Sequence, residues 1–184
     1  MLGTEVVLSA EGRCETPLPP AMSAPLLDDP TAFANASAVL GEEDLDTVLP
    51  QVNRFRMLDG LLREAGDDDV LVGYKEIRGD DWWAADHLPG RPIFPGVLQC
   101  ELAAQLCTWD IVTRQLPEAE RAEAFIGFGG VDNARFRTAV VPDGRLVVAA
   151  RIEKGSRRLW RYLAQGWVGA DLAFEAQIMG VRLS

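Results

Sequence analysis

The stretch VLQCELAAQLCTWDIVTRQ, residues 97–115, is the one long segment of the chain that predicts a helix. It follows Pro95-Gly96 and stops before Pro117, a residue that cannot continue a helix. Apolar residues lie on nearly every side of its first three turns, which is typical of a helix enclosed by a core rather than one lying on a surface. We therefore expect the fold to be built around this helix.

The segments on either side of the helix alternate between apolar and polar residues, as β-strands do. A short helix is expected at 42–49, and the segment 79–96, rich in proline and glycine, is expected to be a loop. One buried helix with several antiparallel strands predicts an α+β domain in which a curved sheet wraps the helix. The expected strands are 54–63, 70–78, 124–129, 134–141, 145–153, 158–169 and 172–183.

The chain divides into two parts of different composition. Residues 1–44 contain five prolines among many Ala, Ser and Asp residues, which breaks any helical or strand period. We expect a flexible or loosely docked N-terminal extension over 1–44 and one domain over 45–184. With 48% hydrophobic and 25% charged residues, the chain has the composition of an ordinary globular protein.

The cellular context follows from what the chain lacks. No apolar run approaches the roughly 20 residues of a membrane helix, and the N-terminal MLGTEVVLSAEGRC has neither the basic start nor the apolar stretch of a secretory signal. Three cysteines, an odd number, argue against a disulfide framework and for a reducing compartment. We expect a cytoplasmic protein whose cysteines are free thiols.

The net charge of −10 makes nucleic acid and anionic membranes poor partners. The acidic excess lies in the first half of the chain, however, and basic residues gather between positions 135 and 161. They form either a docking face for an acidic partner or charged strand surfaces that keep the sheet from aggregating. These basic residues are Arg135, Arg137, Arg145, Arg151, Lys154, Arg157, Arg158 and Arg161.

Two side chains suited to acid–base chemistry lie close to the start of the helix. His87 is the only histidine of the chain, and histidine ordinarily titrates near neutral pH. Glu101 is the only acid in the first three helical turns, so burial should raise its pKa and keep it protonated, or it should be paired. Together they predict a base and an acid. A plainer interpretation is a structural or surface histidine, and a glutamate that only bonds Gln105 one turn on.

Gly96 adds a third element. It lies at the N-terminal end of the helix, where backbone N–H groups lack partners and the helix dipole is positive. A thioester carbonyl placed there would be polarised as it gains enolate charge, and the missing side chain permits close approach.

The sequence HLPGRPIFPGVL, residues 87–98, followed by Glu101 and Gln105, closely resembles the active-site segment of bacterial beta-hydroxyacyl-[acyl-carrier-protein] dehydratases. That family has a catalytic histidine, then Pro-Gly-x-Pro, then Pro-Gly before the central helix, with its acid fourteen positions after the histidine, as here. The segment VDNARFR, residues 131–137, resembles a later strand of the family, so that the resemblance covers about 45–183.

The resemblance implies a hot-dog fold, a curved sheet around a central helix, and a function: dehydration of 3-hydroxyacyl thioesters in fatty-acid or related lipid and polyketide synthesis. It implies that His87 is the base and Glu101 the acid. It further implies that the Gly96 N–H binds the thioester carbonyl, that the carbonyl of Ile93 orients the imidazole, and that Gln105 is the partner of the acid.

The family also implies how the site is assembled and supplied. Two chains share each site, so a homodimer or a trimer of dimers is expected. The substrate arrives on acyl carrier protein or coenzyme A and carries its own 4′-phosphopantetheine arm; no metal or organic cofactor is expected. Because the chain is acidic overall, docking of an acidic carrier would need local basic residues, and Arg91 and Arg137 are the first candidates.

The chain also departs from the family pattern in places, and rival activities stay open. Asp86 and Leu88, on either side of the histidine, differ from the residues common in the family. Relatives that also isomerise the double bond typically carry Asp at the acid position, so Glu101 favours simple dehydration. A hot-dog thioesterase, or a non-catalytic subunit that pairs with an active homologue, would have the same fold.

Overall fold

The computed structural model describes residues 25–183, which form an antiparallel sheet of six strands and one long helix. The strand order is β1-β2-β4-β5-β6-β3. The strands are β1 (Gly60–Arg63), β2 (Val70–Ile77), β3 (Ile126–Phe136), β4 (Gly144–Gly155), β5 (Leu159–Val168) and β6 (Asp171–Arg182). The helical elements are η1 (Pro30–Phe33), α1 (Glu42–Asp46), η2 (Asn53–Phe55), α2 (Trp82–Asp86), α3 (Gly96–Asp110), η3 (Ile111–Gln115) and α4 (Glu118–Arg121).

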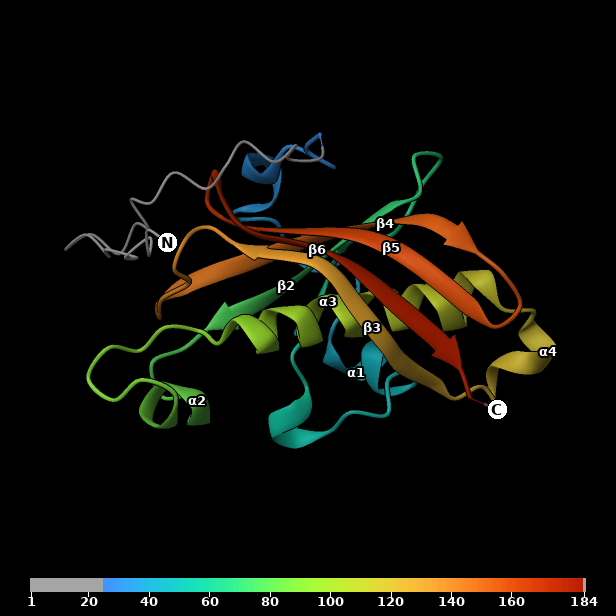
Figure 1. Cartoon of the computed structure of the whole chain (residues 1–184), viewed down its shortest axis with the longest axis horizontal. Helices are drawn as coiled ribbons and strands as arrows, with labels where there is room; N and C mark the ends of the chain where they lie inside the picture. Colours follow the sequence, from blue (N-terminus) through green and yellow to red (C-terminus); the bar gives the residue numbers. More distant parts are fainter. Residues whose placement is uncertain (1–24, 184) are drawn as a thin grey trace, which may run out of the picture.

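The long helix lies where the sequence predicts it. Helix α3 continues into η3, a π-helical turn, so that together they span 96–115. Figure 1 shows α3 lying along one face of the curved sheet. Leu102, Ala103 and Leu106 are fully buried there against inward-facing strand residues such as Val148 and Phe174. The α+β architecture, with a sheet curved over a central helix, is confirmed.

Three local expectations differ from the structure. Of the strand expected at 54–63, only residues 60–63 form a strand, β1, and the stretch begins within the 3₁₀ turn η2. The two strands expected at 124–129 and 134–141 form the single strand β3, whose pairing with β6 shifts register twice; residues 137–141 are not part of it. The loop 79–96 contains the short helix α2. No helix within residues 25–183 is long and apolar enough to cross a membrane.

Part of the segment predicted to be a flexible extension is packed on the sheet. Residues 1–24 lie outside the described residues, but Leu27, Phe33 and Ala36 cover a second apolar cluster that includes Val72 and Trp167, on the sheet face away from α3. Leu40 forms a β-bridge with Leu61 of β1. Residues before the expected boundary at 45 therefore contribute to the packing of the sheet, because this face is apolar and these residues cover it.

The side chain of Leu27 contributes to this cover, and its backbone is tied down as well. The N–H of Leu27 donates to Gln165 Oε1 at 2.8 Å. Farther along, Arg145 donates to the carbonyl oxygen of Ala36 at 2.8 Å and forms an ion pair with Glu76 at 2.5 Å. These polar contacts anchor the segment to β4 and β5 at both of its ends.

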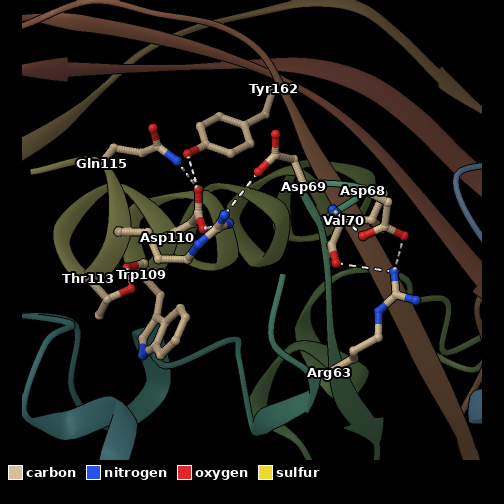
Figure 2. Close-up of polar contacts among 10 residues, drawn as sticks. Arg63, Asp68, Asp69, Val70, Trp109, Asp110, Thr113, Gln115 and Tyr162 are labelled. Atoms are coloured by element: carbon tan, nitrogen blue, oxygen red, sulfur yellow. Dashed lines mark hydrogen bonds and ion pairs between the residues drawn. The ribbon is translucent and has the colours of Figure 1, made fainter. Parts of the chain in front are cut away.

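A buried polar cluster fastens the far end of α3 to the sheet (Figure 2). The carboxylate of Asp110 is fully buried and accepts hydrogen bonds from Tyr162 Oη at 2.5 Å, Gln115 Nε2 at 3.2 Å and Arg114 Nη1 at 2.8 Å. Arg114 also contacts Asp69, just before β2. Burial, together with the nearby Asp110 carboxylate, raises the pKa of Tyr162, so the phenol stays a donor. Arg114 thus compensates the charge of Asp110 at the point where α3 continues as the π-helical turn η3.

Replacing Asp110 by Ala should therefore be destabilising. It leaves the Tyr162 hydroxyl without its buried acceptor and removes one of the two acidic partners of Arg114, and a buried donor left without a partner typically costs about 1–3 kcal/mol. The free energy of unfolding in urea measures this. The control is Asp68→Asn, which keeps an acceptor for the Val70 N–H and removes only the exposed ion pair with Arg63, and it should change the value by less than about 0.5 kcal/mol. Equal effects of the two substitutions would contradict a stabilising role for the buried cluster.

Candidate active site

The loop that carries His87 is held in place on both sides. Before it, α2 ends at Asp86, and His87 caps the helix by donating its N–H to the carbonyl oxygen of Trp83 at 2.9 Å. Trp83 is buried and packs edge-on against Phe94, with ring centroids 5.2 Å apart. Phe94 N–H donates to the carbonyl oxygen of Val140 at 2.7 Å. Trp83 and Phe94, on either side of the loop, are thus packed in the core, although His87 itself is exposed.

The imidazole ring is oriented by a backbone carbonyl. His87 Nδ1 lies 2.9 Å from the carbonyl oxygen of Ile93, the contact that the resemblance implies. Because a carbonyl oxygen can only accept, Nδ1 carries the proton in the neutral ring, and Nε2 keeps its lone pair. The arrangement leaves Nε2 available to take a proton.

A cavity of about 290 Å³ lies beside this ring, at the start of α3. Its wall includes His87, Ile93, Gly96, Arg91 and Arg137. Five residues that the sequence singled out therefore meet in one place, although they come from the loop, the helix and the segment after β3.

Gly96 is the first residue of α3. Among residues 25–183 its N–H donates to no acceptor, and the helix dipole makes this end positive. A Cβ at this position would come within 2.9 Å of two ring carbons of Phe136. The glycine thus lets the ring pack against the helix start, and it leaves a donor free at the cavity.

Glu101 is half-buried on α3 and is held by Gln105, which is fully buried. Gln105 Nε2 donates to Glu101 Oε1 at 2.8 Å and to the carbonyl oxygen of Phe55 at 2.7 Å. Gln105 Oε1 accepts from the N–H groups of Met57 and Leu58 at 2.9 and 3.1 Å. Burial raises the pKa of Glu101, and the bond from Gln105 offsets only part of that. A raised pKa favours the protonated carboxyl, which is the form that can donate a proton.

Within the described part of one chain, the base and the acid do not meet. No hydrogen bond or ion pair joins His87 to Glu101, and neither Glu101 nor Gln105 lines the cavity beside the imidazole. Apolar side chains lie exposed around the open edge strand β3: Phe128 is 54% exposed and Val131 39%. One chain therefore presents the two halves of an acid–base site separately.

The two arginine candidates differ in their surroundings. Arg91 is exposed and forms no ion pair within residues 25–183. Arg137 pairs with the buried carboxylate of Glu175, which compensates its charge. Of the two, Arg91 is the freer cation at the cavity mouth.

Gln99, Thr138 and Ala139 line the cavity but were not singled out by the sequence analysis. Gln99 is 3% exposed and lines the cavity, and its Oε1 has no partner within the described residues. The only signal in the sequence is an amide among apolar residues in the first turns of α3. Cys100 and Cys107 are buried free thiols, and burial raises the pKa of both, which disfavours the reactive thiolate. Within residues 25–183 no three His, Cys, Asp or Glu side chains gather as metal ligands.

Solved structures identify the class of the fold. The dehydratase heterocomplex ApeI:P from Xenorhabdus doucetiae aligns with a TM-score of 0.62 and 14% identity, over 76% of this chain and 91% of that one. A thioesterase superfamily member from Thermus thermophilus aligns with a TM-score of 0.52 and 18% identity, over 66% and 85%. At these identities the likeness concerns the fold alone. The chain is a hot-dog protein, as expected, with a histidine and a free N–H at the start of its central helix.

Sequence comparison then identifies the family. The model of the FabA-like domain matches residues 49–177. A 3-hydroxyacyl-[acyl-carrier-protein] dehydratase, FabZ, of Moorella thermoacetica is 35% identical over 133 residues, covering 72% of this chain and 89% of the relative. The FabZ of Coxiella burnetii is 32% identical over 145 residues, covering 78% and 98%. The chain belongs to the FabA-like family.

Proposed function

We propose that the chain is a 3-hydroxyacyl thioester dehydratase, a carbon–oxygen lyase that forms trans-2-enoyl thioesters. The observation that carries the proposal is the imidazole of His87, fixed by the Ile93 carbonyl with Nε2 free, beside the unpaired Gly96 N–H. An acid–base site with a carbonyl-binding donor suits the removal of an α-proton from a thioester. The names of the FabZ relatives support acyl thioesters on carrier protein as the substrate class, with fatty-acid or related lipid synthesis as the setting.

The reaction needs one proton removed and one supplied. The Gly96 N–H polarises the thioester carbonyl and makes the α-proton more acidic. His87 Nε2 takes that proton, the C–H electron pair forms the C2=C3 double bond, and the C3–O bond breaks. Glu101, whose pKa burial raises, donates its proton as the carboxylic acid to the departing hydroxyl, which leaves as water. The reverse sequence hydrates an enoyl thioester, and no metal or organic cofactor enters either direction.

We propose that two chains complete each site, one giving His87 and the other Glu101. Two features support this: Glu101 lies outside the cavity of its own chain, and the edge strand β3 carries exposed apolar residues. An unpaired edge of this kind is a natural surface for a second copy. A homodimer is the simplest assembly, and a trimer of dimers repeats it. The cytoplasmic location stays a prediction from the cysteine count and from the N-terminal sequence.

Replacing either reacting group should abolish most of the activity. His87→Ala removes the base, and Glu101→Gln keeps the shape and the contact with Gln105 but removes the donated proton. Each loss is expected to be about 10²–10⁴-fold in kcat for hydration of a crotonyl thioester, followed by its ultraviolet absorbance. Thermal unfolding serves as the folding control. Turnover within about twofold of wild type in either folded variant would contradict the assignment.

The shared site predicts complementation between two inactive variants. Mixing His87→Ala chains with Glu101→Gln chains, after dissociation and reassembly, should restore activity, because one of the two sites in a hybrid dimer is intact. Each variant reassembled alone serves as the control and should stay inactive. A wild-type chain that is monomeric by light scattering and fully active at high dilution would rule out a site shared between chains.

Recognition of an acidic carrier protein should depend on Arg91. Arg91→Glu is expected to raise KM for carrier-bound crotonyl substrate by about tenfold, and to weaken its dependence on salt, with little change for crotonyl-N-acetylcysteamine. The matched control is Arg158→Glu, an exposed arginine on the β4–β5 turn that does not line the cavity. Losses of equal size on both substrates would mean that Arg91 supports the site itself rather than the carrier.

A further inference from the structure

The segment 25–40, called the strap below, covers a face and an edge of the sheet. Its side chains Leu27 and Phe33 lie on the outer face, on the side of the sheet away from α3 (Figure 1). At its end, Leu40 forms the β-bridge with Leu61, whose N–H donates to the carbonyl oxygen of Leu40 at 2.9 Å. Open sheet edges and apolar sheet faces are the surfaces through which β-proteins associate. The strap occupies one of each.

The outer face beneath the strap is apolar. The residues that form it come from β1, β2, β4 and β5, and none is more than 6% exposed: Leu62, Val70, Val72, Val147, Ala149 and Trp167. Without the strap, these side chains would form an apolar patch on the surface, of the kind that soluble proteins bury in an interface. Any other occupant of this face must therefore be apolar where it touches the sheet.

The charged residues around the outer face do not favour a charged occupant. Arg63 forms an ion pair with Asp28 of the strap, but also with Asp68, just before β2. Arg145, which holds the strap through a backbone carbonyl, forms its ion pair with Glu76 of β2. Each arginine therefore keeps an acidic partner on the sheet side when the strap leaves. The uncovered face gains no unpaired charge from either of them.

Gln165 indicates which neutral occupant fits. It is fully buried on β5, where it pairs with Ala149 of the outer face. Its Oε1 accepts from the N–H of Leu27 at 2.8 Å, and its Nε2 donates to the carbonyl oxygen of Pro25 at 3.3 Å. A primary amide both donates and accepts, so two glutamine side chains related by a two-fold axis can satisfy each other in the same way. The outer face is thus complementary to a second copy of itself.

We propose that the strap competes with a second copy of this chain for the outer face of the sheet. When the strap is released, two copies stack sheet against sheet, with their Gln165 amides paired across the two-fold axis. Two sheets packed face to face lie about 10 Å apart, as in a β-sandwich. When the strap is docked, it blocks this contact and so limits the size of the assembly. The proposal does not depend on dehydratase activity, because the outer face lies away from α3.

Releasing the strap in the full chain tests this role. Leu27→Asp combined with Phe33→Asp places two charges where the strap meets the apolar face. The molar mass of this released variant, measured by light scattering after gel filtration, should be twice that of the wild-type protein. The matched control is Leu26→Asp combined with Val39→Asp, which makes the same charge change in the same segment at side chains that are 60% and 56% exposed. It should keep the wild-type mass.

A further substitution shows which surface makes the contact. Val72→Glu, added to the released variant, places a carboxylate on the uncovered face. It repels the aspartates of the strap, and stacking would bury it without a partner, so the mass should return to the wild-type value. Thermal unfolding checks the folding of each variant. Leu27→Ser combined with Phe33→Ser provides a milder release if the aspartate variant does not fold.

Three results would overturn the proposal. The first is a wild-type mass for the folded released variant. The second is a doubled mass that persists after Val72→Glu, because the contact would then run through another surface. The third is a doubled mass in the control, or polydisperse aggregates in the released variant, since neither reflects a defined contact made by the outer face.

Discussion

The buried amide of Gln105 is the contact on which both the fold and the site depend. With four hydrogen bonds it joins α3 to the backbone at Phe55, Met57 and Leu58, and it holds Glu101 at the same time. Each donor and acceptor of this amide is used, so the helix can neither rotate nor slide without leaving buried N–H groups unpaired. The register of the central helix against the chain that enters β1 therefore also decides where the acid lies.

Much of this arrangement could be predicted from the sequence because its signals are local. The ends of the helical stretch formed by α3 and η3 follow from Pro95-Gly96 and Pro117, and the roles expected of His87 and Glu101 follow from their residue types, their spacing and the family motif around them. Strands β2, β4, β5 and β6 follow from alternation bounded by turn residues. In these places local preference and tertiary packing agree, which is the condition under which a pattern is informative.

The remaining features depend on contacts between distant residues. Residues 130–133 interrupt the alternation and suggested two strands. In the structure, pairing with β6 continues across two register shifts, so that these residues belong to the single strand β3. Helix α2 was not predicted, because its segment is rich in proline and glycine. It forms where Trp83 packs on Phe94. Gln99 has no local signature, since only the folded chain places it in the wall of the cavity beside His87. No pattern of spacing reveals that a loop and a helix of one chain present separate halves of a site.

The N-terminal segment that covers the outer face of the sheet has a consequence for biosynthesis. Its contacts are among the most distant in the chain: the bond from Leu27 to Gln165 spans 138 positions. A ribosome releases Leu27 long before it has made β5, so this segment cannot dock during most of translation. Until the last strands emerge, the apolar residues around Val72 have no cover, and the growing chain must avoid aggregation without it. The acidic character of the first half of the chain supplies charge repulsion during that interval.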